Sequence, residues 1–288
     1  MNATKPEAKR KPRTPAQIAG GILGGLLTLA LVAFTVFPLL WMLISSLRPA
    51  TELFLSPPTL LPSSFTLDWY LEALGGSNVV RWFANSLVVA LSTALISCTV
   101  GTLAGYALTR FAYPGRRVFM MLLVSAYLFP AILLLMPLYL LLSNYGLVGT
   151  LPAIILAHVA ITLPLATWLM KSFVDSVPRE LEEAALVDGC GPFRAFWRVT
   201  LPLLRTGIAT TMLFSFVLSW DEYLFASALS QGSTTTAPVG IQTFISSFDI
   251  RWGAIMAVGS LVTIPVVVLF VFLQKNFEKG ITAGGVKG

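Results

Sequence analysis

Residues 175–205 read DSVPRELEEAALVDGCGPFRAFWRVTLPLLR, a charged stretch that interrupts an otherwise strongly apolar chain of 288 residues. The positions of its proline and glycine residues predict two short helices that meet at a corner. Pro178 suits the first turn of a helix, because the N–H group that proline lacks would have no partner there. Gly189 suits the end of that helix, because glycine readily adopts the left-handed turn that stops it. Pro192 then begins the second helix.

Small and aromatic side chains recur at helical spacing along both predicted helices. Small residues let another surface approach closely, and acidic residues near the start of the first helix favour the positive end of its dipole. The stretch therefore fits a helix seated in the groove of a partner protein. The alternative is an amphipathic loop that lies on the bilayer surface. The periodic residues are Leu181, Ala184, Ala185 and Asp188 on the first helix, and Phe193, Phe196, Trp197 and Thr200 on the second.

Long uncharged segments dominate the rest of the sequence. A membrane-spanning helix needs ~20 largely apolar residues, and backbone hydrogen bonding in lipid requires helices rather than an open sheet. The uncharged segment 118–170 is too long for one helix, and the sequence SNYGLVGTLP at 143–152 predicts a tight turn that divides it. The fold class is therefore all-α, an integral membrane protein with six transmembrane helices. The predicted spans are 18–47, 82–109, 118–142, 151–171, 206–229 and 252–275.

The basic residues set the orientation. With both termini cytoplasmic, 16 of the 19 Lys and Arg residues lie inside, and only Arg48, Arg81 and Arg251 face out. Such a bias is typical of cytoplasmic loops. The chain then divides into a cytoplasmic basic tail, a six-span membrane domain with one extracytoplasmic and one cytoplasmic loop, and a cytoplasmic C-terminal tail. The bounds are 1–17 for the first tail, 18–275 for the membrane domain, 48–81 and 175–205 for its loops, and 276–288 for the second tail.

The sequence contains few residues that could form a catalytic or metal-binding site. The lone histidine, His158, lies within the fourth predicted span, where a buried, hydrogen-bonded role is favoured over a metal site. Cys98 and Cys190 lie at different levels of the membrane, so neither a disulfide nor a metal site is expected. No Gly-Lys dipeptide occurs, so the phosphate-binding loop of nucleotide hydrolases is absent. We expect no enzyme, and any ATP that drives the protein is hydrolysed by another chain.

The net charge of +6 follows from the membrane topology. Aromatic and basic residues do not alternate in the way that binds bases, so no nucleic-acid partner is expected.

Two carboxylates stand out in the fifth predicted span. Charged residues within a membrane segment usually face a cavity or a partner. Asp221 and Glu222 therefore predict a polar pathway lining or outer gate, with Trp220 and Tyr223 beside them as aromatic contacts for a sugar. The alternative is a hydrated helix end. Asn85, near the outer start of the second span, is a further pathway candidate and alternatively a helix cap.

The motif Glu183-Ala184-Ala185, then Asp188-Gly189, then Leu201-Pro202, resembles the EAA motif of ABC importer permeases. Other segments are similar to carbohydrate-uptake permeases of the maltose type, in particular the second of their two permease subunits. They are FPLLWMLISSLRPATELF at 37–54, SPPTLLPSSFTLDWY at 56–70, NSL at 85–87 and GITAGGVKG at 280–288. Two positions depart from the pattern, Cys190 after the glycine and Arg205 where a second proline is common.

The resemblance implies a type I ABC importer fold in a bacterial or archaeal cell (inner) membrane. It implies a heterodimer with a second permease subunit, two ABC ATPase subunits and an extracytoplasmic solute-binding protein. This chain then binds no cofactor, and ATP and Mg belong to the ATPase. The charged stretch becomes a pair of coupling helices in a cleft of the ATPase, with Glu183 as an ionic contact and Gly189 as the corner. The implied coupling residues are Glu183, Ala184, Ala185, Asp188, Gly189, Phe193, Leu201 and Pro202.

Several questions stay open at this level. The cargo is a sugar or oligosaccharide of the maltose or trehalose type, or alternatively glycerol phosphate or another polar solute. A secondary transporter is a weaker alternative, because no internal repeat is evident and the charged stretch would have no task. The segment 48–81 is either a docking ledge for the solute-binding protein or a loop over the pore mouth. The pairs Gly20/Gly24, Gly21/Gly25 and Gly101/Gly105 predict close helix packing, with the sister permease as one candidate partner.

Overall fold

The computed structural model describes residues 15–76, 78–246 and 250–284. Within these ranges the chain is helical and carries no strand beyond an isolated bridge between Ile245 and Ile250, which confirms the all-α prediction. Four helices are long and apolar enough to cross a membrane, or up to six if each of two bent helix pairs counts as one span. The four are 20–46, 79–110, 151–175 and 252–272. The tail 1–17 lies almost wholly outside the described residues.

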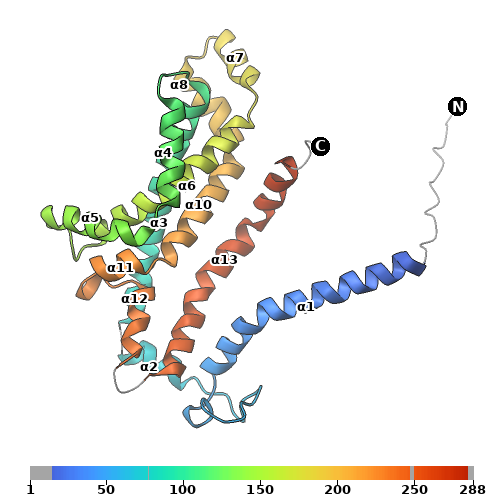
Figure 1. Ribbon diagram of the computed structural model, residues 1–288, viewed down its shortest axis with the longest axis vertical. Helices are drawn as coiled ribbons and strands as arrows, with labels where there is room; N and C mark the ends of the chain where they lie inside the picture. The colour runs from blue at the N-terminus through green and yellow to red at the C-terminus, as the bar shows by residue number, and fades with distance from the viewer. Residues whose placement is uncertain (1–14, 77, 247–249, 285–288) are drawn as a thin grey trace.

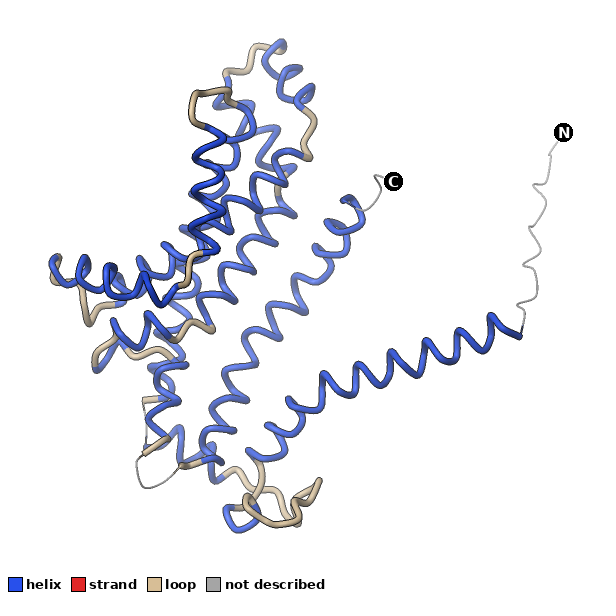
Figure 2. Tube along the Cα trace, viewed as in Figure 1, coloured by secondary structure: helices blue, strands red, loops and turns tan. Residues whose placement is uncertain are grey.

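Three helices form the centre of the molecule (Figures 1 and 2). They are α3 (Val79–Arg110), α6 (Leu151–Asp175) and α10 (Arg205–Trp220). Gly101 and Gly105 allow α3 to lie directly against α6, since a Cβ atom at Gly105 would stand 2.7 Å from the backbone nitrogen of Lys171. This glycine pair therefore packs within the chain and not against a sister subunit, because small residues let two backbones approach closely.

The outer helices α1 (Pro15–Ser46) and α13 (Trp252–Gly284) meet at only one end (Figure 1). There the Met42 sulfur lies 3.3 Å from the position of a Cβ at Gly259. Beyond this contact α1 diverges from the bundle, and none of its apolar 18-residue window is buried. A Cβ added at glycine 20, 21, 24 or 25 would meet no atom of another described element within 4 Å. α13 continues to Gly284, so much of the predicted tail 276–288 is helical.

The predicted third span is not one helix. It consists of α4 (Arg116–Leu128) and α5 (Ala131–Asn144), which are bent by 100° relative to one another. The break falls at Phe129-Pro130, where Phe129 is extended with ψ 133°. A residue before proline is disfavoured in the helical region, and proline supplies no N–H to continue the helix. The tight turn expected at 143–152 is confirmed by the left-handed glycines Gly146 and Gly149.

The predicted fifth span is also broken. α10 ends at Trp220, and the short helix α11 (Leu224–Leu229) begins after a gap that contains Asp221 and Glu222. The Glu222 carboxylate accepts hydrogen bonds from the backbone N–H groups of Phe225 at 3.0 Å and Ala226 at 3.1 Å. These N–H groups at the start of α11 have no partner inside the helix, so the carboxylate stabilises a new helix start there.

The segment 48–81 contains the helix α2 (Asp68–Gly76), which packs against α13. Arg48 is 2% exposed, and its guanidinium donates to the Thr59 carbonyl at 2.7 Å. Glu72 pairs with Arg251 at the start of α13. In the same segment, the hydroxyl and the backbone N–H of Ser63 donate hydrogen bonds to the Glu52 carboxylate. These bonds hold the pKa of that carboxyl below its usual value.

Short helices complete both ends of the bundle. Near α2 and α11 they are η1 (Ala50–Glu52), η3 (Gly232–Thr234), α12 (Ala237–Ile241) and η4 (Gln242–Phe244). At the opposite end they are α7 (Arg179–Val187), α8 (Pro192–Ala195), the π turn η2 (Phe196–Thr200) and α9 (Leu201–Leu203).

Candidate functional site

The corner at residues 175–205 lies at the end of the bundle farthest from α2 (Figure 1). Pro178 precedes α7, and Gly189 follows it with φ +87°, as the sequence predicted. The Cys190 N–H donates to the Ala185 carbonyl at 2.9 Å, and the Gly189 N–H donates to the Leu186 carbonyl at 3.0 Å. These two bonds form a Schellman motif, which satisfies carbonyls that the helix end leaves without partners. The corner is therefore fixed by backbone geometry.

The second part of the corner begins at Pro192 as predicted, but it is not one regular helix. A short α-helical turn passes into the π turn at Phe196–Thr200 and then into α9. The run from Pro192 to Leu203 meets α10 at an angle of 73°. Leu204, at this bend, is 1% exposed and packs with Met170 and Val174 of α6. The bend is thus anchored in the bundle rather than free.

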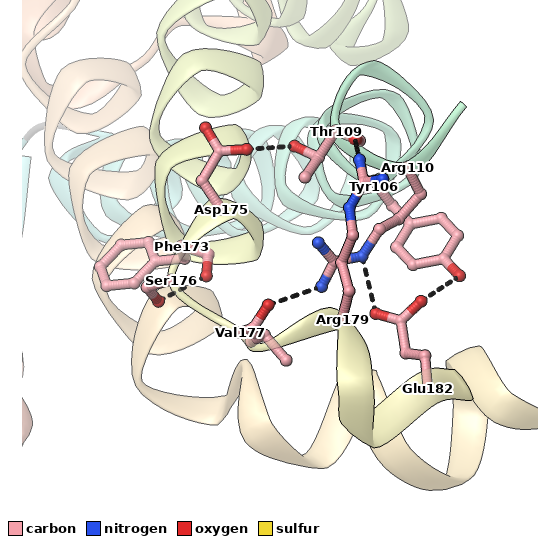
Figure 3. Close-up of polar contacts among 9 residues, drawn as sticks. All are labelled: Tyr106, Thr109, Arg110, Phe173, Asp175, Ser176, Val177, Arg179 and Glu182. Carbon is pink, nitrogen blue, oxygen red and sulfur yellow. Dashed lines mark hydrogen bonds and ion pairs between the residues drawn. The ribbon is translucent and has the colours of Figure 1, made fainter. Parts of the chain in front are cut away.

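One carboxylate fastens α7 to the bundle. Glu182 is 8% exposed and forms an ion pair with Arg110 at the end of α3, with Nε and Oε1 2.8 Å apart (Figure 3). Its second oxygen accepts a hydrogen bond from the Tyr106 hydroxyl at 3.0 Å. The Arg110 guanidinium also donates to the Val177 carbonyl at 2.8 Å. Both carboxylate oxygens and two sides of the guanidinium are therefore occupied, which is the condition for a buried pair to be tolerated.

A second set of contacts joins the end of α3 to the start of α7 and to the end of α6. The Arg179 guanidinium donates to the Thr109 carbonyl at 2.6 Å, and the Thr109 hydroxyl donates to the Asp175 carboxylate at 2.9 Å (Figure 3). Asp175 is also paired with Lys171, one turn earlier on α6. We call Tyr106, Arg110 and Glu182 the α7 clamp.

The α7 clamp was not predicted from the sequence. Glu183 was predicted as the contact residue, whereas the structure turns Glu182 inward and leaves Glu183 exposed. The Arg110–Glu182 pairing joins residues 72 positions apart, so no local pattern reports it. The sequence does place Glu182 three residues before the small residue Ala185, and the structure buries both on the inner face of α7.

The outward face of the corner is exposed and partly apolar. Val187 is 88% exposed and Phe193 is 77% exposed, and the Phe193 and Trp197 rings lie 6.0 Å apart at their centroids. The sequence analysis placed four residues of the second helix on one face, but the structure divides them. Phe196 is buried, with its ring 4.7 Å from that of Tyr106, and Thr200 is also buried. Only Phe193 and Trp197 remain available to a partner.

The predicted coupling residues therefore differ in exposure. Glu183, Ala184, Asp188, Gly189, Phe193 and Pro202 are exposed, Leu201 is half-buried and Ala185 is buried. We call Glu183, Val187, Asp188, Phe193 and Trp197 the outer patch. A surface with two carboxylates beside apolar side chains can take both a basic and an apolar contact from a partner.

Two of the predicted pathway residues form hydrogen bonds inside the chain. Asn85 is 8% exposed, and its amide donates to the carbonyls of Ser233 and Thr235, both at 2.8 Å. It ties α3 to the segment before α12, which differs from both the pathway lining and the cap that the sequence suggested. Trp220 is 3% exposed, and its indole N–H donates to the Val262 carbonyl at 3.1 Å. Both side chains are occupied by contacts inside the chain.

The remaining pathway candidates lie at the break between α10 and α11. Asp221 and Tyr223 are exposed, and Glu222 lines a cavity of about 660 Å³ bounded by α4, α5 and α6. Glu222 also lies 2.9 Å from Nε2 of His158, whose Nδ1 is 2.7 Å from the Ser219 hydroxyl. His158 is 1% exposed, so the buried, hydrogen-bonded role predicted for it is confirmed, and the carboxylate beside it was not foreseen.

Comparison with known proteins gives the corner its context. Residues 97–283 match the family described as "Binding-protein-dependent transport system inner membrane component". The chain belongs to this family. The match includes the corner, α6, α10 and α13, so the predicted resemblance to ABC importer permeases is confirmed. This permease is accordingly a transport subunit rather than a catalytic enzyme, and it is a multi-pass membrane protein.

Individual relatives agree with the family. The permease is 37% identical over 257 residues to the inner membrane ABC transporter permease protein YcjP of Escherichia coli (strain K12), covering 88% of this chain and 92% of that protein. It is 36% identical over 227 residues to the maltodextrin transport system permease protein MdxG of Bacillus subtilis (strain 168), covering 78% and 82%.

A solved structure shares the fold. It is a bacterial ABC transporter involved in the import of the acidic polysaccharide alginate, in which one chain superposes with a TM-score of 0.77 at 20% identity. The superposition covers 92% of this permease and 99% of that chain.

Proposed function

We propose that this chain forms half of the translocation pathway of an ATP-driven importer for a sugar or oligosaccharide. The name of the maltodextrin relative and the maltose-type segments of the sequence support this cargo. The other half is a second permease subunit, and the energy comes from two ATPase subunits that bind ATP and Mg. A solute-binding protein delivers the cargo, as the family description implies.

The observation that carries the proposal is the construction of the corner. Its inner side is pinned to α3 by the α7 clamp, and its outer patch is exposed at the end of the bundle. An element that is fixed to the transmembrane helices and open to a partner can transmit a partner's movement. ATP-driven closure of the ATPase pair then moves α7, and α3 moves with it. The spans swing so that the cavity opens to the other side of the membrane.

The topology that we propose has six spans and both termini in the cytoplasm. The four unbroken spans are joined by two interrupted ones, α4 with α5, and α10 followed by α11. The concentration of basic residues at the α7 end supports this orientation. The segment 48–81 then faces outward, where α2 offers a surface to the solute-binding protein. The break at Asp221, Glu222 and Tyr223 lies beside the cavity of about 660 Å³ and is our candidate for contact with cargo.

The test is reconstitution of the chain with its sister permease, ATPase and solute-binding protein in nanodiscs. ATP hydrolysis is measured across maltodextrins, trehalose, glycerol phosphate and polyols. Stimulation by a sugar, lost in a Phe193→Asp variant that still inserts, is the expected result. Stimulation by glycerol phosphate alone would move the chain to the other substrate class. Failure to assemble with any ATPase would contradict the coupling role of the corner.

A further inference from the structure

A groove between α4 and α6 contains two cavities that the transport mechanism does not use. The first has a volume of about 490 Å³ and lies at the α7 end of the helices. Three cations line it, Arg116 and Arg117 at the start of α4 and Lys171 on α6, together with the aromatic side chain of Tyr113. It is a basic cavity at the level where a membrane helix begins.

The second cavity lies along the same helix pair and is apolar. It has a volume of about 300 Å³ and is lined by Leu123, Val124 and Tyr127 of α4 and by Pro164, Leu165 and Trp168 of α6. Met120 of the basic cavity, Val124 and Tyr127 follow helical spacing on α4, and so do Lys171, Trp168 and Pro164 on α6. The two cavities are therefore consecutive parts of one groove, with a basic end followed by an apolar floor.

The positive charge of the basic cavity is only partly neutralised by neighbouring carboxylates. Arg117 is exposed, and it forms no ion pair with any residue that the structure describes. Lys171 forms an ion pair with Asp175. The Asp175 carboxylate also accepts a hydrogen bond from the Thr109 hydroxyl and is attracted by the charge of Arg116. Three cations thus line the cavity, and among the described residues one carboxylate, Asp175, is paired with one of them, which leaves a positive excess there.

The surroundings of the groove are suited to lipid. Next to the arginines, α4 exposes Val118, Phe119, Met121 and Leu122, each by more than 40% of its surface. Trp168 and Tyr127 in the apolar cavity are about half exposed, at 49% and 50%. Arginine and lysine at a helix end with aromatic residues below them are typical of the membrane interface. A cationic cavity between helix ends attracts anionic lipid head groups.

We propose that the α4–α6 groove binds one anionic phospholipid, with the phosphate at Arg116, Arg117 and Lys171 and an acyl chain on the apolar floor. This site requires only that the chain spans a membrane, so it does not depend on the cargo or on the coupling role of the corner. Charge complementarity selects the occupant, because a zwitterionic lipid or an apolar helix of a sister subunit would leave the basic cavity without a net counter-charge.

Brominated lipids test this site, because bromine on an acyl chain quenches a nearby indole. The assembled transporter is placed in nanodiscs that contain brominated phosphatidylglycerol or brominated phosphatidylcholine at increasing mole fraction. The contribution of Trp168 is the difference in fluorescence between the wild type and Trp168→Phe, which cancels all other tryptophans. We expect phosphatidylglycerol to saturate this quenching at a much lower mole fraction than phosphatidylcholine.

The matched variants distinguish a direct contact with the lipid head group from a long-range attraction by the protein's overall charge. Arg117→Gln removes an exposed, unpaired cation, so the fold is unaffected. It should raise the half-saturating mole fraction of phosphatidylglycerol roughly fivefold, and the Arg116→Gln/Arg117→Gln pair should raise it further. Arg81→Gln, at the other end of the bundle, should leave it unchanged. Equal quenching by both lipids, or no response to the arginine variants, would overturn the proposal. Complete shielding of Trp168 in the assembly would also overturn it and mark the groove as a subunit interface.

Discussion

Glu182 and Glu183 are neighbours in sequence, but they belong to opposite faces of the same corner. Glu182 is 8% exposed and holds Arg110 and Tyr106, whereas Glu183 points away from the bundle and is exposed. One step along a helix rotates the side chain by about 100°, which is enough to separate the two roles. One face of α7 thus fastens the corner to the bundle, and the other presents the corner to solvent.

The two faces also differ in how mutation should act. A buried ion pair adds little net stability, but removal of one partner is costly because the other charge remains buried. Exposed side chains contribute little to folding and become important only when a partner covers them. Changes on the inner face should therefore disturb the permease itself, and changes on the outer face should disturb only its docking.

Glu182→Ala should have the largest effect. It leaves the Arg110 guanidinium buried without its carboxylate and should cost about 3 kcal/mol. We expect α7 and the following turn, 179–204, to exchange amide hydrogens much faster, as measured by mass spectrometry. Glu183→Ala is the matched control and should leave exchange unchanged. Equal protection in the two variants would mean that the α7 clamp does not hold the corner.

Phe193→Asp should have the next largest effect, and it acts on the other face. Phe193 is 77% exposed, so folding and hydrogen exchange should be unchanged. Affinity for the ATPase should fall roughly 30-fold, a loss of about 2 kcal/mol that is typical of a central interface residue. Titration of labelled ATPase into nanodisc-embedded permease measures it. Undiminished binding would place the docking surface elsewhere on the chain.

Gly189→Val should have an intermediate effect that touches both faces. A side chain at φ +87° costs about 1 to 2 kcal/mol, although no atom blocks the space for a Cβ. The corner should lose its geometry, so ATP hydrolysis continues while solute uptake per ATP falls. Gly191→Val is the matched control, because Gly191 has φ −73° and is equally open. Similar uptake ratios in both variants would show that the left-handed turn is dispensable.

Cys190→Ala should have the smallest effect, below about 0.5 kcal/mol. Cys190 contributes its backbone N–H to the Schellman motif, and alanine supplies the same group. In the wild type the half-buried thiol should react with a maleimide, while Cys98 in α3 stays buried and slow. Addition of the ATPase should slow labelling of Cys190 if the outer patch is the docking surface. An unchanged labelling rate would separate the corner from the interface.

The features that the sequence predicted well are the local ones. Pro178 and Gly189 delimit α7 because helix starts and stops depend on a few adjacent residues. The break at Phe129-Pro130 was equally local, but a hydropathy argument treats the segment as one span. The break at Glu222 depends on its carboxylate, which caps the start of α11. Only the tertiary structure determines that the carboxylate takes this position.

The site was harder to predict than the fold. Arg110, Tyr106 and Glu182 come together only because α3 and α6 pack through Gly101 and Gly105, so a pattern in 175–205 cannot identify them. The occupied side chains of Asn85 and Trp220 show the same limit. A polar or aromatic residue near the end of a span can face a pathway or a neighbouring helix, and composition does not distinguish the two.

The position of α1 has a consequence for the order in which the chain folds. Among the described helices, α1 is synthesised before all the others, yet its main contact is with α13, which is synthesised after them. A contact between segments this far apart in sequence forms late, because it must wait for everything between them. α1 is therefore without this partner while the helices between them are made. The contact between α1 and α13 forms only when α13 has been inserted.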